Sequence, residues 1–129
     1  MRVAHWMVLA LPLPAWAHHS FAMFDSKVDV TLTGTVKEMQ WTNPHAWIEL
    51  LVPSDKPGAT DQWSVECLAP NGLTRMGWSA DTLKPGDHVI IKIHPLKDGS
   101  KGGSLIVALT ADGRPVAGRP VGVPLPPGA

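Results

Sequence analysis

An alternation of apolar and polar residues over positions 28–41 points this chain toward a β-rich fold. A period of two residues is the pattern of a strand with one buried face. The phase of the alternation flips near its end, because Met39 and Trp41 are apolar at odd positions. A β-bulge near Lys37–Glu38, or a strong bend after Gly34, would produce that flip and let a long strand curl into a small barrel. The expected inward row before the flip is Val28, Val30, Leu32, Gly34 and Val36.

Four further segments read as strands, at about residues 45–52, 62–67, 88–94 and 105–109. A short helix, capped by Asn71 and ended by Gly77, is expected between the third and fourth strands. This order predicts an all-β fold, a small five-stranded OB-fold-like barrel with one short helix between strands 3 and 4. An immunoglobulin-like sandwich, the competing fold, needs about seven strands. The expected inward rows are Ala46, Ile48, Leu50 and Val52; Trp63, Val65 and Cys67; Val89, Ile91 and Ile93; and Leu105, Val107 and Leu109.

The chain divides into three parts by composition. Residues 1–17 resemble a signal peptide, with Arg2, an apolar run and a small-residue cleavage site ending at Ala17. The apolar run is shorter than the ~20 residues of a membrane span, although a retained anchor is the alternative. Residues 18–112 form the predicted barrel domain, and residues 113–129 a disordered tail rich in proline and glycine. We therefore expect a periplasmic or secreted protein with no stable membrane span after cleavage.

Charge and motifs exclude several functional classes. The chain has 11 basic and 11 acidic side chains, so nothing in its charge favours nucleic acid. Cys67 is the only cysteine, so no internal disulfide is possible, and we expect it to be buried. The sequence lacks a serine nucleophile motif, a phosphate-binding loop and a CxxC pair. Nothing in it demands an enzyme.

Histidines are the residues with the most chemical potential. Cleavage after Ala17 would leave His18 with a free α-amine beside its imidazole, and these two groups can chelate one metal ion. Such nitrogen donors suit copper(II), nickel or zinc. His45 and His94 lie at the ends of two loops that OB-fold barrels bring together on the ligand-binding side. The candidate metal ligands are therefore His18, His19, His45 and His94, with copper as the expected ion. Metal binding would release protons and weaken as the pH falls.

Each of these residues also has a structural interpretation. His18 and His19 can simply be solvated, His45 and His94 can hydrogen-bond neighbouring turns, and His88 is expected on the surface. Trp47 shares the outward row with His45 and can either face a ligand or pack under Phe21 or Phe24. Glu66 and Arg75 are expected to form an ion pair between the third strand and the helix.

Several stretches resemble a family of small exported bacterial proteins known only as a domain of unknown function. They are residues 18–21 (HHSF), 34–36 (GTV), 41–45 (WTNPH), 63–66 (WSVE), 69–78 (APNGLTRMGW), 83–87 (LKPGD) and 97–99 (KDG). The resemblance implies export and a small β-barrel but no activity. His18, His19 and His45 fall within these stretches, whereas His94 lies outside them, which makes it the weaker ligand candidate.

Two hypotheses from different classes follow. The first is a periplasmic module that binds copper through its amino-terminal histidine. The second is a metal-free barrel adaptor that binds a protein or a small organic ligand through the face carrying Trp47. A copper oxidase is a third, for which the sequence offers no substrate-specific feature.

Overall fold

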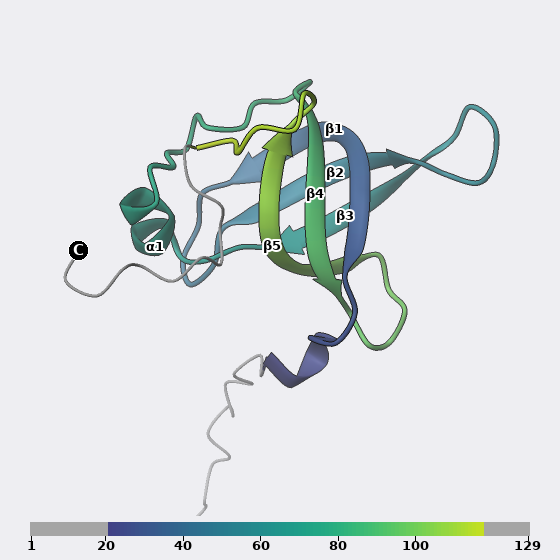
Figure 1. Cartoon of the computed structure of the whole chain (residues 1–129), viewed down its shortest axis with the longest axis horizontal. Coiled ribbons are helices and arrows are strands. Elements are labelled where there is room, and N and C mark those ends of the chain that lie inside the picture. The colour runs from purple at the N-terminus through teal and green to yellow at the C-terminus, as the bar shows by residue number, and fades with distance from the viewer. Residues whose placement is uncertain (1–20, 118–129) are drawn as a thin grey trace, which may run out of the picture.

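The computed structural model describes residues 21–117, which form a closed β-barrel with the strand order β1-β2-β3-β5-β4 (Figure 1). All strand pairs are antiparallel except β3 and β5, which run parallel. A short helix lies between β3 and β4, so the predicted five-stranded, OB-like barrel is confirmed. The elements are η1 (Phe21–Met23), β1 (Val30–Gln40), β2 (Trp47–Pro53), β3 (Thr60–Glu66), α1 (Pro70–Arg75), β4 (His88–Pro95) and β5 (Gly102–Thr110).

Strand β1 serves two neighbours, as its sequence predicted. Its first half pairs with β4 and its second half with β2. The register with β2 shifts between Val36 and Glu38, which is the predicted bulge. Val28, which the alternation assigned to the inward row, precedes the strand and is exposed.

The barrel interior is filled by the inward rows of all five strands, and the rows predicted for β2 and β4 are confirmed. The row predicted for β5 is wrong beyond Leu105. The β4–β5 register shifts between Lys92 and Ile93, so Ala108 rather than Val107 points into the core. The fully buried side chains are Val36, Ile48, Leu50, Val65, Leu73, Ile91 and Ile93.

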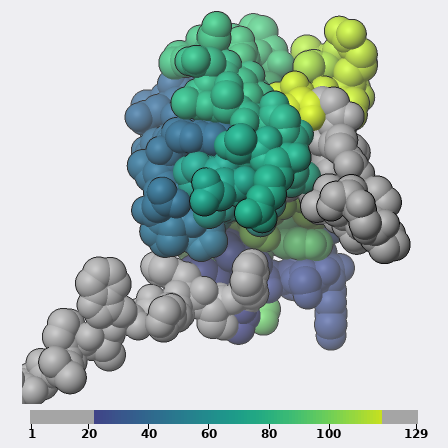
Figure 2. Space-filling model, turned by 90° about the vertical axis from the view of Figure 1, so that its left-hand side faces the viewer, coloured from purple at the N-terminus to yellow at the C-terminus, as the bar shows by residue number. Residues whose placement is uncertain are grey.

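Helix α1 joins the core through Leu73, which is fully buried, and the segment that contains the helix faces the viewer in Figure 2. The helix begins two residues earlier than predicted, with Ala69 rather than Asn71 at the N-cap, Pro70 in its first turn and no side-chain cap. The proposed cap by Asn71 is therefore wrong, because proline, which lacks an N–H, is favoured at the start of a helix. The end of the helix was predicted correctly, since Gly77 has a positive φ of 88°.

Residues 23–25 form an N-terminal strap against the β4–β5 loop, at the bottom of Figure 1. Asp25 donates its backbone N–H to Pro95 at 2.8 Å, and the carbonyl of Met23 accepts from Lys97 at 3.0 Å. Between them, Phe24 is buried and pairs with Leu96. Two backbone hydrogen bonds and the buried ring of Phe24 therefore hold residues 23–25 against the barrel.

The segment after β5 folds back onto the edge of that strand. Thr110 donates to the carbonyl of Arg114 and Val116 to that of Ala108, and Val116 and Ala117 pack against the core. The first residues of the predicted tail therefore pair with the barrel, and the rest lie outside the described residues. The signal-peptide prediction also lies outside them. Within residues 21–117, no helix is long and apolar enough to cross a membrane.

Candidate functional site

One row of outward-facing residues crosses four strands at the end of the barrel near the strap. Trp47 of β2 pairs in register with Glu66 of β3, Glu66 with Ser104 of β5, and Ser104 with His94 of β4. Paired residues of neighbouring strands project to the same face. The register thus gathers an indole, a carboxylate, a hydroxyl and an imidazole on one surface.

Beside this row lies a cavity of about 220 Å³ that brings His45 and His94 together. We call it the histidine cavity. Phe24 of the strap closes part of it, so the N-terminal segment and both histidines border the same space. Its lining residues are Phe24, His45, Glu66, Cys67, Leu68, His94, Ser104 and Leu105. The cavity therefore agrees with the expectation from the sequence that His45 and His94 lie close together in the fold.

The imidazole of His45 is held by contacts at both ring nitrogens. Its Nδ1 lies 3.0 Å from the carbonyl oxygen of Cys67, which can only accept, so Nδ1 carries a hydrogen and donates it. Its Nε2 lies 3.2 Å from Oε1 of Glu66. A histidine whose Nδ1 is occupied by a backbone carbonyl presents Nε2 in a fixed direction, the arrangement common among metal-binding histidines.

His94 is oriented in a similar way. Its Nδ1 lies 3.1 Å from the carbonyl oxygen of Val28 and 3.4 Å from Oδ1 of Asp29, and both of these are acceptors. Asp29 also pairs with Lys92. Among the described residues, Nε2 of His94 has no hydrogen-bond or ion-pair partner. Each histidine of the cavity therefore has its Nδ1 committed to the backbone.

Cys67 borders the cavity but offers no thiolate to it. Its sulfur is buried and contacts the carbonyl of Val65 at 3.7 Å. Burial, with a smaller effect from the charge of Glu66, raises the pKa of the thiol to about 12. The prediction that Cys67 is a buried hydrophobe is confirmed, and the donors of this cavity are nitrogen and oxygen atoms.

The part of the chain that the structure describes contains no group of three or more His, Cys, Asp or Glu side chains able to hold a metal ion. His18 and His19, the other two candidates, lie outside the described residues.

Trp47 borders a smaller, neighbouring cavity of about 100 Å³. Its ring is half-buried, and Met23 and Phe24 of the strap line the same space. This arrangement agrees with the interpretation in which Trp47 packs under the N-terminal segment. Small-molecule sites usually have volumes of about 300–1,000 Å³, so this cavity does not favour an organic ligand.

The expected Glu66–Arg75 ion pair is wrong. Glu66 contacts His45 instead, and the exposed Arg75 forms no ion pair with any described residue. Glu66 is the last residue of β3, and its carboxylate lies 3.2 Å from Nε2 of His45. Sequence reasoning assigned Glu66 a structural role because only the register of β2, β3 and β5 reveals its neighbours.

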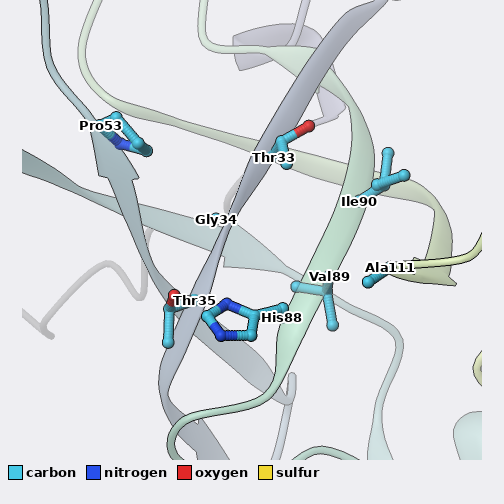
Figure 3. Close-up of a pocket in the computed structure, with 8 residues that line it drawn as sticks. All are labelled: Thr33, Gly34, Thr35, Pro53, His88, Val89, Ile90 and Ala111. Atoms are coloured by element: carbon cyan, nitrogen blue, oxygen red, sulfur yellow. Dashed lines mark hydrogen bonds between the residues drawn. The ribbon is translucent and has the colours of Figure 1, made fainter.

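A separate open hollow of about 420 Å³ lies over β1 and β4, with Pro53 and Ala111 at its rim (Figure 3). His88 is exposed there, as predicted, and its Nδ1 lies 3.1 Å from the hydroxyl of Thr35. His88 is the only ionisable side chain that lines the hollow among the described residues. Although larger than the histidine cavity, the hollow offers no convergent set of donors.

Residues 7–105 match a family of unknown function (DUF6152), which covers most of the barrel. No curated protein and no solved structure gives a significant match to the chain.

Proposed function

Since the chain belongs to the DUF6152 family, whose function is unknown, we propose a function from its own residues. It is an exported barrel that binds one transition-metal ion, copper by preference, at the histidine cavity. His18 supplies its α-amine and imidazole, and His45 supplies a third nitrogen. His94 and His19 are auxiliary donors. Copper is preferred because nitrogen ligands bind it more tightly than the other common divalent ions.

The observation that carries the proposal is the orientation of the two imidazoles. His45 and His94 border one cavity, and each donates its Nδ1 hydrogen to a backbone carbonyl. Holding Nδ1 in this way fixes the tautomer. Nε2 of His94 has no partner among the described residues, whereas Nε2 of His45 lies 3.2 Å from Oε1 of Glu66. Histidines that only support a turn would not need to share a cavity.

The strap supports a contribution from the N-terminus. Phe24 lines the histidine cavity, and His18 precedes Phe24 by six residues. Six residues of extended chain span at most about 21 Å. His18 is therefore within reach of His45, and the backbone bonds of the strap keep the tether short.

The proposal includes export and cleavage between Ala17 and His18, because only cleavage there creates an α-amine beside the imidazole of His18. Copper(II) titration by calorimetry tests it on protein collected after export, compared with protein carrying one extra N-terminal residue. We expect the extra residue to weaken binding at least about tenfold, since it removes one donor. Equal affinities would reject the terminal-amine site.

The role of His45 is tested with a matched pair of variants. His45→Ala is expected to weaken copper(II) binding about tenfold or more, because it removes the third nitrogen. His88→Ala, which alters an exposed histidine elsewhere on the barrel, is expected to leave the affinity unchanged. Equal affinity of both variants and the parent protein would remove His45 from the site.

A further inference from the structure

We propose that the strap covers a docking site for an extended peptide segment of a partner protein, and that a bulky aromatic side chain of the partner takes the place of Phe24 there. The site is the surface between the histidine cavity and the smaller cavity beside Trp47, because Phe24 lines both. We call this surface the Phe24 seat. It is built from the strap and the barrel and does not depend on a metal ion.

Phe24 is buried without belonging to the barrel core. Its side chain is 8% exposed, yet the continuous apolar cluster inside the barrel does not include it. The barrel therefore closes without Phe24, and the seat lies on the outside of a complete core. In this position the ring of Phe24 occupies a surface site much as a bound ligand does.

The strap is held by backbone groups that every extended peptide possesses. Strand β1 pairs with β4 only as far as Ile93, and beyond that point the strap bonds to the same edge. Asp25 donates its N–H to the carbonyl of Pro95, and the carbonyl of Met23 accepts from Lys97. Addition of an extended segment to a strand edge is a common mode of peptide recognition, in which backbone bonds give affinity and side-chain pockets give specificity. This edge therefore suits an extended segment of a partner.

Phe24 leaves space in the seat unfilled. The two cavities on which it borders have volumes of about 220 and 100 Å³. Atoms that line an empty space lack the dispersion contacts that a closely packed neighbour would provide. A ring larger than phenyl fills more of this space, so a partner can gain contacts that the strap does not make.

The histidine cavity also offers an unused hydrogen-bond acceptor. Nδ1 of His94 donates to the Val28 carbonyl, so Nε2 is the acceptor of the neutral ring, and it has no partner among the described residues. Tryptophan and tyrosine combine an apolar ring with a donor group, which usually finds a partner when it is buried. The seat thus favours these two side chains over phenylalanine.

The strap competes with any partner because it is tethered beside the seat. Residues 26–29, which join it to β1, are all exposed. A tether this short holds the strap at an effective concentration on the order of millimolar. The apparent affinity of a partner is therefore reduced by the fraction of molecules in which the strap is open.

The test uses synthetic peptides with the sequence of residues 22–27 and copper-free exported protein, and it follows the backbone amide signals of Leu96 and Lys97 by NMR. Protein carrying Phe24→Ala, which empties the seat, is expected to bind the unchanged peptide. It should bind a peptide carrying Phe24→Trp at least about threefold more tightly, and one carrying Phe24→Ala at least about tenfold more weakly. The parent protein should bind each peptide about tenfold more weakly than the variant does, because its own strap competes.

Two exposed apolar residues provide a matched pair of variants. Leu68 lines the histidine cavity, whereas Val28 lines neither cavity. Added to the Phe24→Ala protein, Leu68→Ala should weaken binding of the Phe24→Trp peptide about threefold or more, since it removes apolar contact area. Val28→Ala should leave that affinity unchanged.

Each contrary outcome overturns the inference. Unmoved amide signals with both aromatic peptides would show that the seat is not a docking site, and a parent protein that binds neither would show that the strap is not displaced. Equal affinity for the Phe24→Ala peptide would remove the aromatic ring from recognition, and equal affinity for the Phe24→Trp peptide would contradict the unfilled space. If the Phe24→Ala protein does not fold, Asp25→Pro, which deletes the N–H that bonds Pro95, opens the strap instead and must give the same order of affinities.

Discussion

Cys67 shows how burial changes the chemistry of a single residue. Its thiol is withdrawn from water in the core and its pKa is raised to about 12, well above the ordinary value for cysteine. The folded protein therefore holds this proton at pH values where the unfolded chain releases it. A group whose pKa is raised by folding stabilises the fold below its unfolded pKa, and that contribution is lost as the pH rises toward its folded pKa.

We therefore expect the free energy of unfolding to fall by up to about 1.4 kcal/mol per pH unit between about pH 9 and pH 12 because of Cys67. Urea unfolding of the parent protein and of Cys67→Ala over this range isolates the effect, since both share all other titrating groups. The variant should lose less stability per pH unit. Parallel pH profiles would show that the thiol is not withdrawn from water.

The site residues could be predicted from the sequence only where position along the chain fixes their surroundings. His45 lies in the loop before β2 and His94 lies near the end of β4, and the barrel topology brings them to one cavity. Glu66 was given the wrong partner, because its neighbours depend on how β3 aligns with β2 and β5. That cross-strand register has no local signature in the sequence.

At the scale of elements, Gly34 allows β1 to pass close to β2. A Cβ at this position would collide with the carbonyl oxygen of Leu51 and lie 3.2 Å from Cγ of Leu50. Both contacts belong to the packed barrel wall, and a backbone carbonyl that is part of a strand cannot move aside cheaply.

Gly34→Ala should accordingly destabilise the fold by about 1–3 kcal/mol, although alanine normally suits a strand better than glycine. Thr33→Ala, at the exposed neighbouring position, should cost about 1 kcal/mol or less. Urea unfolding measures both changes. A Gly34→Ala variant as stable as the parent would mean that β1 and β2 are farther apart than described.

The bounds and phase of each strand were predicted well where apolar and polar residues alternate regularly. The alternation in β1, including its phase change, located the bulge after Val36. In β5 five consecutive apolar residues, 105–109, conceal the phase, and the register shift next to Ile93 reverses it. The start of α1 was misplaced because a cap by Asn71 and a start at Pro70 are both locally favourable.

For the molecule as a whole, the strap joins the N-terminus to the barrel. Phe24 is 8% exposed and lies between two backbone hydrogen bonds to the β4–β5 segment. The strap thereby limits the volume that the preceding residues can explore, which raises the effective concentration of an N-terminal donor at the cavity.

Phe24→Ala is expected to loosen the strap while the barrel stays folded, and to weaken copper(II) binding about tenfold by lowering that effective concentration. Hydrogen exchange should be faster at the amides of Asp25 and Lys97, which bond across the strap. Val28→Ala, at an exposed site in the same segment, is the control. Unchanged affinity despite faster exchange would separate the strap from metal binding.

Elemental analysis of the exported protein, isolated from its own host, decides whether the molecule carries metal. Mass spectrometry of the same sample identifies its first residue. The account predicts a chain that begins at His18 and holds one copper ion, retained in His88→Ala and lost in His45→Ala. A chain with a different first residue, or one that carries no transition metal at stoichiometric amounts, would contradict it.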